Sequence, residues 1–331
     1  IGLDVRVFPA DHGIDCLGYC MDLNRPGKFD PQAAKAKGIP QKFWGRLQKG
    51  EAIGGFSPDD VLGESRKGIR ILYSTDTRPV PAMEEYGRGA DLLILEGMYG
   101  DHEKQSRAEI SHHMMMQEAA NVNATSLGFG YDEMIETNTA WVLSRIHLRF
   151  KRYPQWRDNV TLKTWHKGMA KLFYLRDFVL TDTDGETLAE ATSSWLIIDM
   201  NTRRLVRNSD LATSPDKCTK EDAIAEPAEK VMLPVDIEPE LVRKHPVTWS
   251  EIDSNGHVNN VNYVMWAIDA VKSEDIKERQ IKEMLINYDA EVMPGDTVKI
   301  SRIRIEDGDN LTYYITGIVA DKQNFSVKLV F

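Results

Sequence analysis

Hydrophobic and polar positions alternate along much of the chain, and the pattern of alternation changes near residue 118. Before that point, two short apolar runs at residues 69–74 and 91–96 flank a segment with the composition of a turn and a short helix. This order predicts a strand-helix-strand unit of α/β character. The segment 111–129 contains few helix breakers and therefore predicts one helix.

Longer alternating runs follow this helix. They predict strands over residues 141–150, 159–165, 172–181 and 193–199. The sequence TDTDGET is typical of a hairpin turn centred on Asp-Gly. A second cycle begins near Pro246 with a short strand, the loop SEIDSNGHVNN, a helix over residues 261–271 and further strands. The same order of elements therefore occurs twice.

Two pairs of segments indicate an internal duplication. The stretches IHLRFKRYPQWRDNVTLKTW and LINYDAEVMPGDTVKISRI each combine an alternating strand, a Pro-bearing turn, an Asp and a strand through Val160 or Val298. The hairpins FYLRDFVLTDTDGETLAEATSSWLIID and YYITGIVADKQNFSVKLVF correspond in the same way. Two unrelated hairpins could also alternate, but the shared Pro and Asp favour duplication. We predict two modules, each a helix with an antiparallel sheet, joined by a polar linker over residues 206–245.

Composition restricts the function classes further. The 331 residues are 42% hydrophobic and carry a formal net charge of -10, which disfavours general affinity for nucleic acid. No apolar run approaches the length that spans a bilayer, and the first residues lack the pattern of a signal peptide. The three cysteines form no CxxC pair. We expect a cytoplasmic globular protein, and the start at Ile1 suggests a fragment or a missing natural start.

The richest polar constellation is TWSEIDSNGHVNNVNYVMW. Asp253, Asn255 and His257 alternate in it, and Asn259 and Asn260 then open an amphipathic helix. Alternate residues of an extended segment face the same way, and a helix start offers unpaired N–H groups that can stabilise an oxyanion. A polar turn that merely caps a helix is the structural alternative.

This motif, D-x-N-x-H-x-N-N-x-x-Y, is followed by Glu291 in NYDAEVMPGD and resembles the acyl-acyl-carrier-protein thioesterases. The similarity runs from about residue 118 to the C-terminus and includes GFGYDEMIETNTAWVLSRIHLRFKRYP. It implies an α+β tandem double hotdog fold. The first module would span residues 118–230 and lack its first strand, and the second, residues 231–331, would hold the catalytic residues. The implied reaction hydrolyses fatty acyl-acyl-carrier-protein thioesters to free fatty acid without a cofactor.

The resemblance assigns catalysis to Asp253, Asn255, His257 and Glu291. The Glu291 carboxylate can activate water or attack directly, and His257 can move a proton near neutral pH. Asn255 can orient the carbonyl or the water, while Asp253 can hold His257 or the neighbouring backbone. Plant members carry Cys beside this Glu, whereas this chain has Val292, so no thiol is available there.

Acyl carrier protein and the fatty acyl chain are the expected partners. We expect Asn259, Leu127, Phe129 and Trp141 to bind substrate, the last three in an acyl tunnel, although each could equally be a core residue. A basic set could dock the acidic carrier protein or could simply be solvated: Lys151, Arg152, Arg157, Lys163, Lys167 and Lys171. A monomer and a homodimer both remain open.

Residues 1–117 have a different resemblance. HGIDCLGYCMDLNRPGKFD, YSTDTRP, ADLLILEGMYG and SHHM resemble the C-terminal part of ribonuclease Z in the metallo-β-lactamase family. The resemblance implies vestigial metal ligands at Asp76 and His113, but the HxHxDH motif of a dinuclear zinc site is absent. We expect either a truncated, inactive segment without bound zinc or half of a site that another chain completes. A metal-dependent tRNA 3′-processing endonuclease and a non-catalytic acyl or carrier-protein binding module are the alternative functions.

Overall fold

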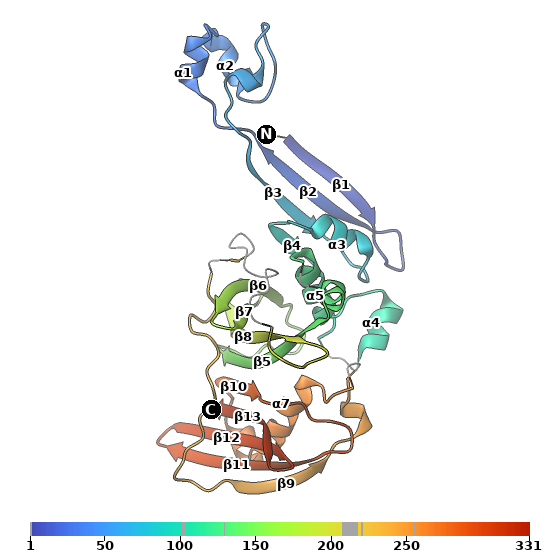
Figure 1. Cartoon of the computed structure of the whole chain (residues 1–331), viewed down its shortest axis with the longest axis vertical. Helices are drawn as coiled ribbons and strands as arrows, with labels where there is room; N and C mark the ends of the chain where they lie inside the picture. Colours follow the sequence, from blue (N-terminus) through green and yellow to red (C-terminus); the bar gives the residue numbers. More distant parts are fainter. Residues whose placement is uncertain (1, 101–103, 129, 207–217, 220, 254–255) are drawn as a thin grey trace. The chain divides into compact units, whose positions relative to one another are not determined.

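The computed structural model describes residues 2–100, 104–128, 130–206, 218–219, 221–253 and 256–331 (Figure 1). The chain divides into two compact units, Ile1–Thr137 and Asn138–Phe331, and each contains its own sheet. Among the described helices, none is long and apolar enough to cross a membrane.

The first unit contains a sheet with the strand order β1-β2-β3-β4. Its strands are β1 (Gly2–Pro9), β2 (Leu17–Arg25), β3 (Arg66–Tyr73) and β4 (Leu92–Ile94). β1, β2 and β3 pair antiparallel, whereas β3 and β4 pair parallel. Parallel pairing requires a crossover, and α3 (Pro81–Gly87) supplies it. The strand-helix-strand unit predicted from the sequence is present.

A small helical insertion separates β2 from β3. It contains α1 (Pro31–Ala36), α2 (Gln41–Leu47) and the 3₁₀ helix η1 (Pro58–Asp60). The Asp30 side chain caps α1 by accepting hydrogen bonds from the N–H groups of Gln32 and Ala33. The insertion has a small core of its own, made by Ala34, Ile39, Leu47 and Val61.

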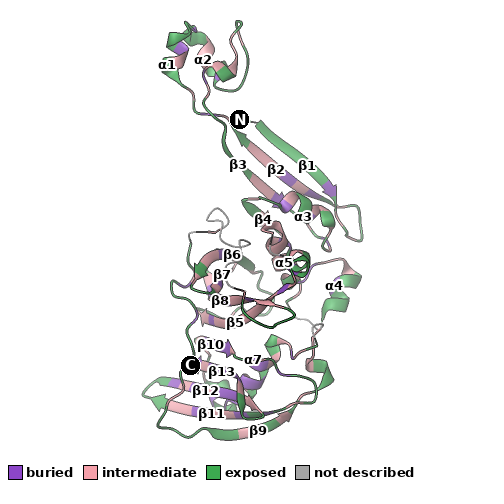
Figure 2. Ribbon diagram, in the orientation of Figure 1, coloured by how far each residue is buried: buried purple, intermediate pink, exposed green. Residues whose placement is uncertain are grey.

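The two faces of the first sheet differ in burial. On one face, Phe8 and Leu72 join Met83 of α3 in a core that also contains Met114 and Val122. The opposite face carries apolar side chains from all four strands: Leu3, Val5, Val7, Tyr19, Met21, Leu23, Ile69, Ile71, Tyr73, Leu92 and Ile94. Much of this second face is exposed, and β1 is coloured almost entirely as exposed in Figure 2. The sheet is therefore buried on one face only.

The helix predicted over residues 111–129 is wrong as a single element. The structure has α4 (Gln105–Ser111), α5 (Met116–Ser126) and then α6 (Tyr131–Glu136). His112 ends α4 with φ +55°, a left-handed conformation that an α-helix cannot continue through. Val122 of α5 lies in the core beside α3, so this helix packs within the first unit.

The second unit contains one antiparallel sheet with the order β6-β7-β8-β5-β10-β13-β12-β11-β9. Its strands are β5 (Thr139–Phe150), β6 (Thr161–Ala170), β7 (Phe173–Thr181), β8 (Thr187–Asp199), β9 (Glu240–Pro246), β10 (Glu283–Tyr288), β11 (Thr297–Asp307), β12 (Asn310–Val319) and β13 (Lys322–Val330). The order reads as two mirrored halves about the central pair β5-β10. This is the arrangement expected of a duplication, except that β9 has no counterpart among the described strands of the first half.

The second half of this sheet curves around helix α7 (Asn260–Asp269), with η4 (Trp249–Glu251) before it and α8 (Ser273–Glu278) after it. Tyr263 and Trp266 of α7 are buried against Ile286 and Phe325 of the sheet. A sheet wrapped around one helix is the hotdog arrangement predicted from the sequence, and the fold class is α+β.

The linker between the modules packs on the other face of the sheet. Ile286 belongs to the α7 core, so the next side chain in β10, Asn287, points to the opposite face. There the Asn287 side chain accepts from the N–H of Val231 at 2.7 Å and donates to the carbonyl of Glu229 at 3.0 Å. Arg145 of β5, which pairs with Asn287, donates to the linker carbonyl of Ala228. The linker thus ties both halves of the sheet together.

A buried carboxylate fixes α8 to the second module. Asp275 accepts hydrogen bonds from Arg304 at 2.8 and 3.1 Å and from the Tyr313 hydroxyl at 2.5 Å. These bonds, above all the one from Arg304, lower the pKa of Asp275 from 3.8 to about 2. Because the folded pKa is depressed, the stabilisation is present above about pH 4 and disappears as the pH falls through about 2.

We therefore expect Asp275→Asn to lower the free energy of unfolding at pH 7 by about 2 kcal/mol. Urea unfolding followed by tryptophan fluorescence measures this. The difference between variant and wild type should shrink between pH 4 and pH 2, because wild-type Asp275 is protonated there. A difference that stays constant across this interval would contradict the account.

Candidate active site

A short backbone-bonded turn precedes α7 and presents the histidine. The N–H of Asp253 donates to the carbonyl of His257 at 2.8 Å, and the N–H of Gly256 donates to the carbonyl of Asp253 at 3.1 Å. Gly256 has φ +79°, which residues with a Cβ rarely adopt. The Asp253 carboxylate lies 3.4 Å from the N–H of His257. The segment from Asp253 to His257 is therefore a turn and not the extended segment expected from the alternation of its polar residues. The turn fixes the position of His257, while Asn255 lies outside the described residues.

Glu291 lies in the loop that joins β10 to β11. The side-chain amide of Asn324 in β13 donates to the Glu291 carbonyl at 3.0 Å. The carbonyl of Asn324 accepts from the N–H groups of Asp289 at 2.8 Å and Ala290 at 3.1 Å. One asparagine of the neighbouring strand therefore holds three consecutive residues that end at Glu291.

Helix α7 holds the same loop from its other side. The N–H of Val292 donates to the buried hydroxyl of Tyr263 at 3.1 Å, and the Val292 carbonyl accepts from the N–H of Val258 at 3.0 Å. The Tyr263 ring packs edge-on against Tyr288 and Phe325. Burial raises the pKa of Tyr263 to about 12, so its hydroxyl stays protonated at neutral pH.

These two anchored loops bring an imidazole and a carboxylate together. Nε2 of His257 lies 3.4 Å from Oε2 of Glu291. The guanidinium of Arg203, from the turn after β8, lies 3.1 Å from the same oxygen. Among the described residues, the other oxygen, Oε1, accepts no hydrogen bond. Glu291 is 44% exposed and His257 is 23% exposed, so a substrate can reach this pair.

Arg203 was not among the residues predicted from the sequence. It lies 88 positions before Glu291 and belongs to the other module, and no motif surrounds it. Only the antiparallel arrangement of β8, β5 and β10 brings the end of β8 to the end of β10. The sequence therefore held no local signal for this contact.

The residues predicted to bind substrate lie in different places. The side-chain oxygen of Asn259 accepts from the N–H of Val261 at 3.0 Å and so caps α7. Trp141 of β5 packs edge-on against Tyr174 at 5.0 Å between ring centroids. Leu127 follows α5 in the first unit, and Phe129 lies outside the described residues. Their roles in substrate binding stay predictions.

Lys167 does not belong to the basic surface predicted to dock acyl carrier protein. The side chain of Lys167 is 5% exposed and lies 3.2 Å from the buried Asp177. It cannot offer its charge to a partner's surface. Lys151 pairs with Glu190, and Lys163 pairs with Glu221, both near the surface.

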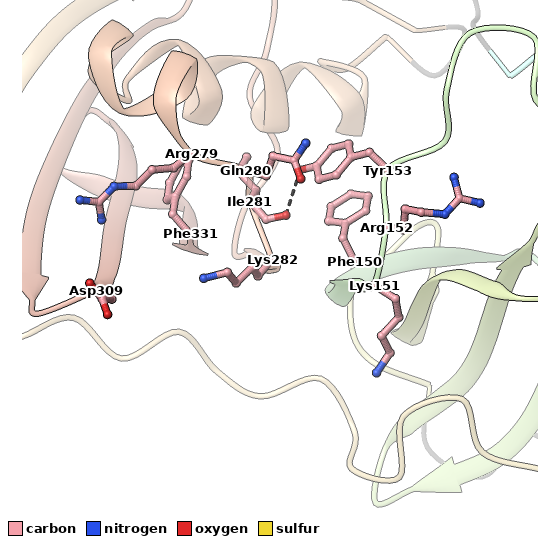
Figure 3. A pocket seen from close by; sticks show the side chains of 10 residues that line it. All are labelled: Phe150, Lys151, Arg152, Tyr153, Arg279, Gln280, Ile281, Lys282, Asp309 and Phe331. Carbon is pink, nitrogen blue, oxygen red and sulfur yellow. Dashed lines mark hydrogen bonds between the residues drawn. The ribbon is translucent and has the colours of Figure 1, made fainter.

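A pocket of about 560 Å³ lies at the end of the central strand pair away from Glu291 (Figure 3). Its lining residues are Phe150, Lys151, Arg152, Tyr153, Arg279, Gln280, Ile281, Lys282, Asp309 and Phe331. The rings of Phe150 and Tyr153 stack there at 4.6 Å between centroids. The Tyr153 hydroxyl donates to the carbonyl of Ile281 at 2.9 Å.

This pocket is the counterpart of the end that carries Glu291 under the internal symmetry. The N–H groups of Lys151 and Arg152 both donate to the carbonyl of Leu188, at 2.8 and 3.1 Å. Asp289 and Ala290 bond to the carbonyl of Asn324 in the same way, so the next residue, Tyr153, stands where the second module has Glu291. Of these two ends, therefore, only that of the second module carries the carboxylate.

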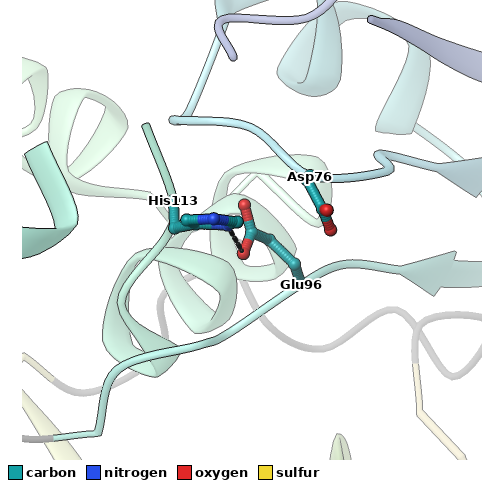
Figure 4. A group of neighbouring side chains, drawn as sticks. All are labelled: Asp76, Glu96 and His113. Atoms are coloured by element: carbon teal, nitrogen blue, oxygen red, sulfur yellow. Dashed lines mark hydrogen bonds and ion pairs between the residues drawn. The ribbon is translucent and has the colours of Figure 1, made fainter. Parts of the chain in front are cut away.

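Three potential metal ligands lie together in the first unit: Asp76, Glu96 and His113, with donor atoms within 4.8 Å of one another (Figure 4). Nδ1 of His113 bonds to Oε2 of Glu96 at 2.9 Å, and the N–H of Thr77 donates to Oε1 of Glu96 at 2.5 Å. Each oxygen of Glu96 thus accepts or shares one hydrogen bond in this arrangement. The three side chains are the number of protein ligands that a catalytic zinc site uses, although the HxHxDH motif of a dinuclear site is absent.

A duplicated hotdog sheet with a carboxylate-imidazole pair at one end defines the class of double hotdog thioester hydrolases. The model of the acyl-ACP thioesterase N-terminal domain matches residues 97–214, and that of the acyl-ACP thioesterase C-terminal domain matches residues 236–329. The chain belongs to the acyl-ACP thioesterase family, where ACP is acyl carrier protein. Membership in this family supports hydrolysis of fatty acyl-ACP thioesters.

Solved structures agree on the fold. An acyl-ACP thioesterase of Bacteroides thetaiotaomicron is 22% identical, with a TM-score of 0.57 over 72% of this chain and 95% of that one. The 12:0-ACP thioesterase of Umbellularia californica is 24% identical, with a TM-score of 0.59 over 65% of this chain and 83% of that one. At these identities the likeness concerns the fold alone.

The N-terminal third has different relatives. Ribonuclease Z of Clostridium acetobutylicum is 47% identical over 125 residues, which are 36% of this chain and 40% of that protein. Ribonuclease Z of Lachnoclostridium phytofermentans is 44% identical over 122 residues. The chain thus spans about 40% of the length of these relatives. The resemblance predicted for this segment is confirmed.

The hydrogen bond from Val292 to Tyr263 can be tested directly. We expect Tyr263→Phe to lower the free energy of unfolding by about 1 to 3 kcal/mol, because it leaves the buried N–H of Val292 without its partner. Thioesterase turnover should fall with it, since the loop of Glu291 loses an anchor. Chemical unfolding and steady-state kinetics measure both effects. Tyr288→Phe, which removes a more exposed hydroxyl, is the matched control, and equal losses in the two variants would contradict this role.

Proposed function

We propose that the chain hydrolyses fatty acyl-ACP thioesters at His257 and Glu291 and releases free fatty acid. The observation that carries the proposal is the approach of Nε2 of His257 to Oε2 of Glu291 at 3.4 Å, at the exposed end of the central strand pair. Membership in the thioesterase family supports the reaction class. The second oxygen of Glu291, which accepts no hydrogen bond from the residues that the structure describes, gives a water molecule a place to bind.

In the proposed reaction Glu291 acts as a general base. Water attacks the carbonyl carbon of the thioester while the Glu291 carboxylate takes its proton. The tetrahedral intermediate collapses, the bond from carbon to sulfur breaks, and the thiol leaves with a proton that passes through His257. The products are one fatty acid and the free thiol of the carrier. Asp253 supports the turn that presents His257, and Asn255 orients the carbonyl or the water.

The proposed acyl donor is acyl carrier protein, an acidic partner. Electrostatic attraction would direct it to basic side chains near the surface. Lys151 and Lys163 keep their charges near solvent, although each has a carboxylate neighbour. Exposed ion pairs of this kind contribute about 1 kcal/mol or less, so a partner's carboxylate can replace the internal one.

Glu291→Gln tests the proposal most directly. We expect kcat with an acyl-ACP substrate to fall by about 100-fold to 10,000-fold, because the amide cannot accept the proton. His257→Ala should lose a comparable factor. Release of free thiol by the purified chain, measured continuously, gives the rates.

Glu283→Gln is the matched control, because Glu283 at the start of β10 also pairs with a histidine, His147 at 2.6 Å, away from Glu291. It should change stability but keep kcat within about twofold. Wild-type rates in Glu291→Gln would reject the site. If wild-type protein gained the mass of an acyl group during a single turnover, Glu291 would be a nucleophile and not a general base.

We further propose that the reaction requires no metal or organic cofactor and that the first unit does not hold zinc. The absence of an HxHxDH motif supports this, because a dinuclear zinc site needs several histidines, and the candidate group of Asp76, Glu96 and His113 contains one. Purified protein should contain well under 0.1 equivalent of zinc by elemental analysis, roughly the level of adventitious metal. Dialysis against a chelator should leave thioesterase turnover unchanged. Stoichiometric zinc that Asp76→Ala removes would instead favour the nuclease-like alternative.

A further inference from the structure

We propose that Arg203, which the first module contributes, is a positioning residue for Glu291. The inference rests on the proposed function, because it assumes that Glu291 takes part in the reaction. Its basis is the 3.1 Å contact between the Arg203 guanidinium and Oε2 of Glu291. His257 approaches the same oxygen from the second module.

A hydrogen bond from Arg203 and the nearby imidazole of His257 both act on one oxygen and so define the orientation of the carboxylate. With Oε2 held by Arg203 and His257, rotation about the last side-chain bond of Glu291 would break both contacts. Oε1 is then kept away from both donors and stays available to the reacting water. The guanidinium suits this task because it remains charged at any working pH and donates in a fixed plane.

The turn that carries Arg203 is held tightly by its own hydrogen bonds. Oδ1 of Asp199 accepts from the N–H groups of Asn201 at 3.1 Å and Thr202 at 2.7 Å, and also from the Thr202 hydroxyl at 2.8 Å. The N–H of Arg203 donates to the Asp199 carbonyl at 2.9 Å. Asn138, at the start of β5, donates to Oδ2 of Asp199 at 3.1 Å. The end of β8 therefore positions the backbone of Arg203 accurately.

Arg203 itself adopts φ +55°, a left-handed conformation that favours glycine. An arginine here is strained relative to a glycine, yet its side chain reaches the catalytic carboxylate. The contact is largely exposed, at 54% for Arg203 and 44% for Glu291, so it adds little to folding stability. Because the backbone is strained and the contact adds little stability, we infer that this side chain contributes to the reaction and not to folding.

Arg203→Gly separates the two roles, because it removes the side chain and relieves the backbone strain. We expect its stability to equal or exceed that of wild type, while kcat falls about tenfold to a hundredfold, the usual range for one hydrogen bond to a charged group. KM should change by less than about twofold. Arg203→Lys should recover part of kcat, and added guanidinium ion should partly rescue Arg203→Gly.

Arg204→Ala is the control, because Arg204 is the adjacent exposed arginine of the same turn and makes no ion pair among the described residues. It should keep wild-type kinetics. If Arg203→Gly keeps wild-type kcat while Glu291→Gln is inactive, this inference fails and the proposed function stands. If Glu291→Gln is also fully active, the proposed function fails with it.

Discussion

The antiparallel pairing of β5 with β10 is the constraint on which the rest of the second unit depends. It joins the two halves into one sheet, with Arg149 opposite Glu283 and Arg145 opposite Asn287. Because the halves are related by an internal two-fold symmetry, each end of this strand pair presents the same backbone geometry. Equivalent hydrogen bonds to the carbonyls of Leu188 and Asn324 demonstrate this. Chemistry is then decided by single side chains, a tyrosine at one end and Glu291 at the other.

The two modules consequently differ in the segment that packs on their half of the sheet and in the residues that they place near Glu291. The second keeps its helix, α7, against the sheet, and this helix anchors the loop of Glu291 through Tyr263. In the first, α5, which comes before α6 and β5 in the chain, is committed to the core of the first unit beside α3. The polar linker instead bonds to both central strands on the face opposite α7. The first module retains β5, which pairs with β10, and the turn of Arg203, which contacts Glu291.

Sequence alone predicted the features that short-range patterns encode. The alternation of the strands and the repeated order of elements are carried by segments of a few tens of residues, where side-chain periodicity reports the structure. The residues from Asp253 to His257 were expected to be extended and instead form a turn. The sequence overestimated the helix at residues 111–129, because the left-handed residue His112 is not glycine and carried no breaker signal. It missed Glu96 and Arg203, since each meets its partner only through sheet order. Contacts between residues that only the strand order brings together produce no local sequence pattern.

In the first unit, strong sequence similarity is combined with short coverage of the related proteins. Its amino-acid sequence is 47% identical to a ribonuclease Z, yet the match extends over about 40% of that protein's length. Its sheet is buried on one face only. That face packs against α3, while apolar side chains of the other face are exposed, with exposed fractions of 52% for Val5 and 45% for Ile94. Contiguous apolar surface of this kind is costly in water. The same unit brings Asp76, Glu96 and His113 close to one another, with Glu96 hydrogen-bonded to His113 at 2.9 Å. Local sequence and local hydrogen bonds therefore place these three side chains together although the match covers less than half of the relatives' length.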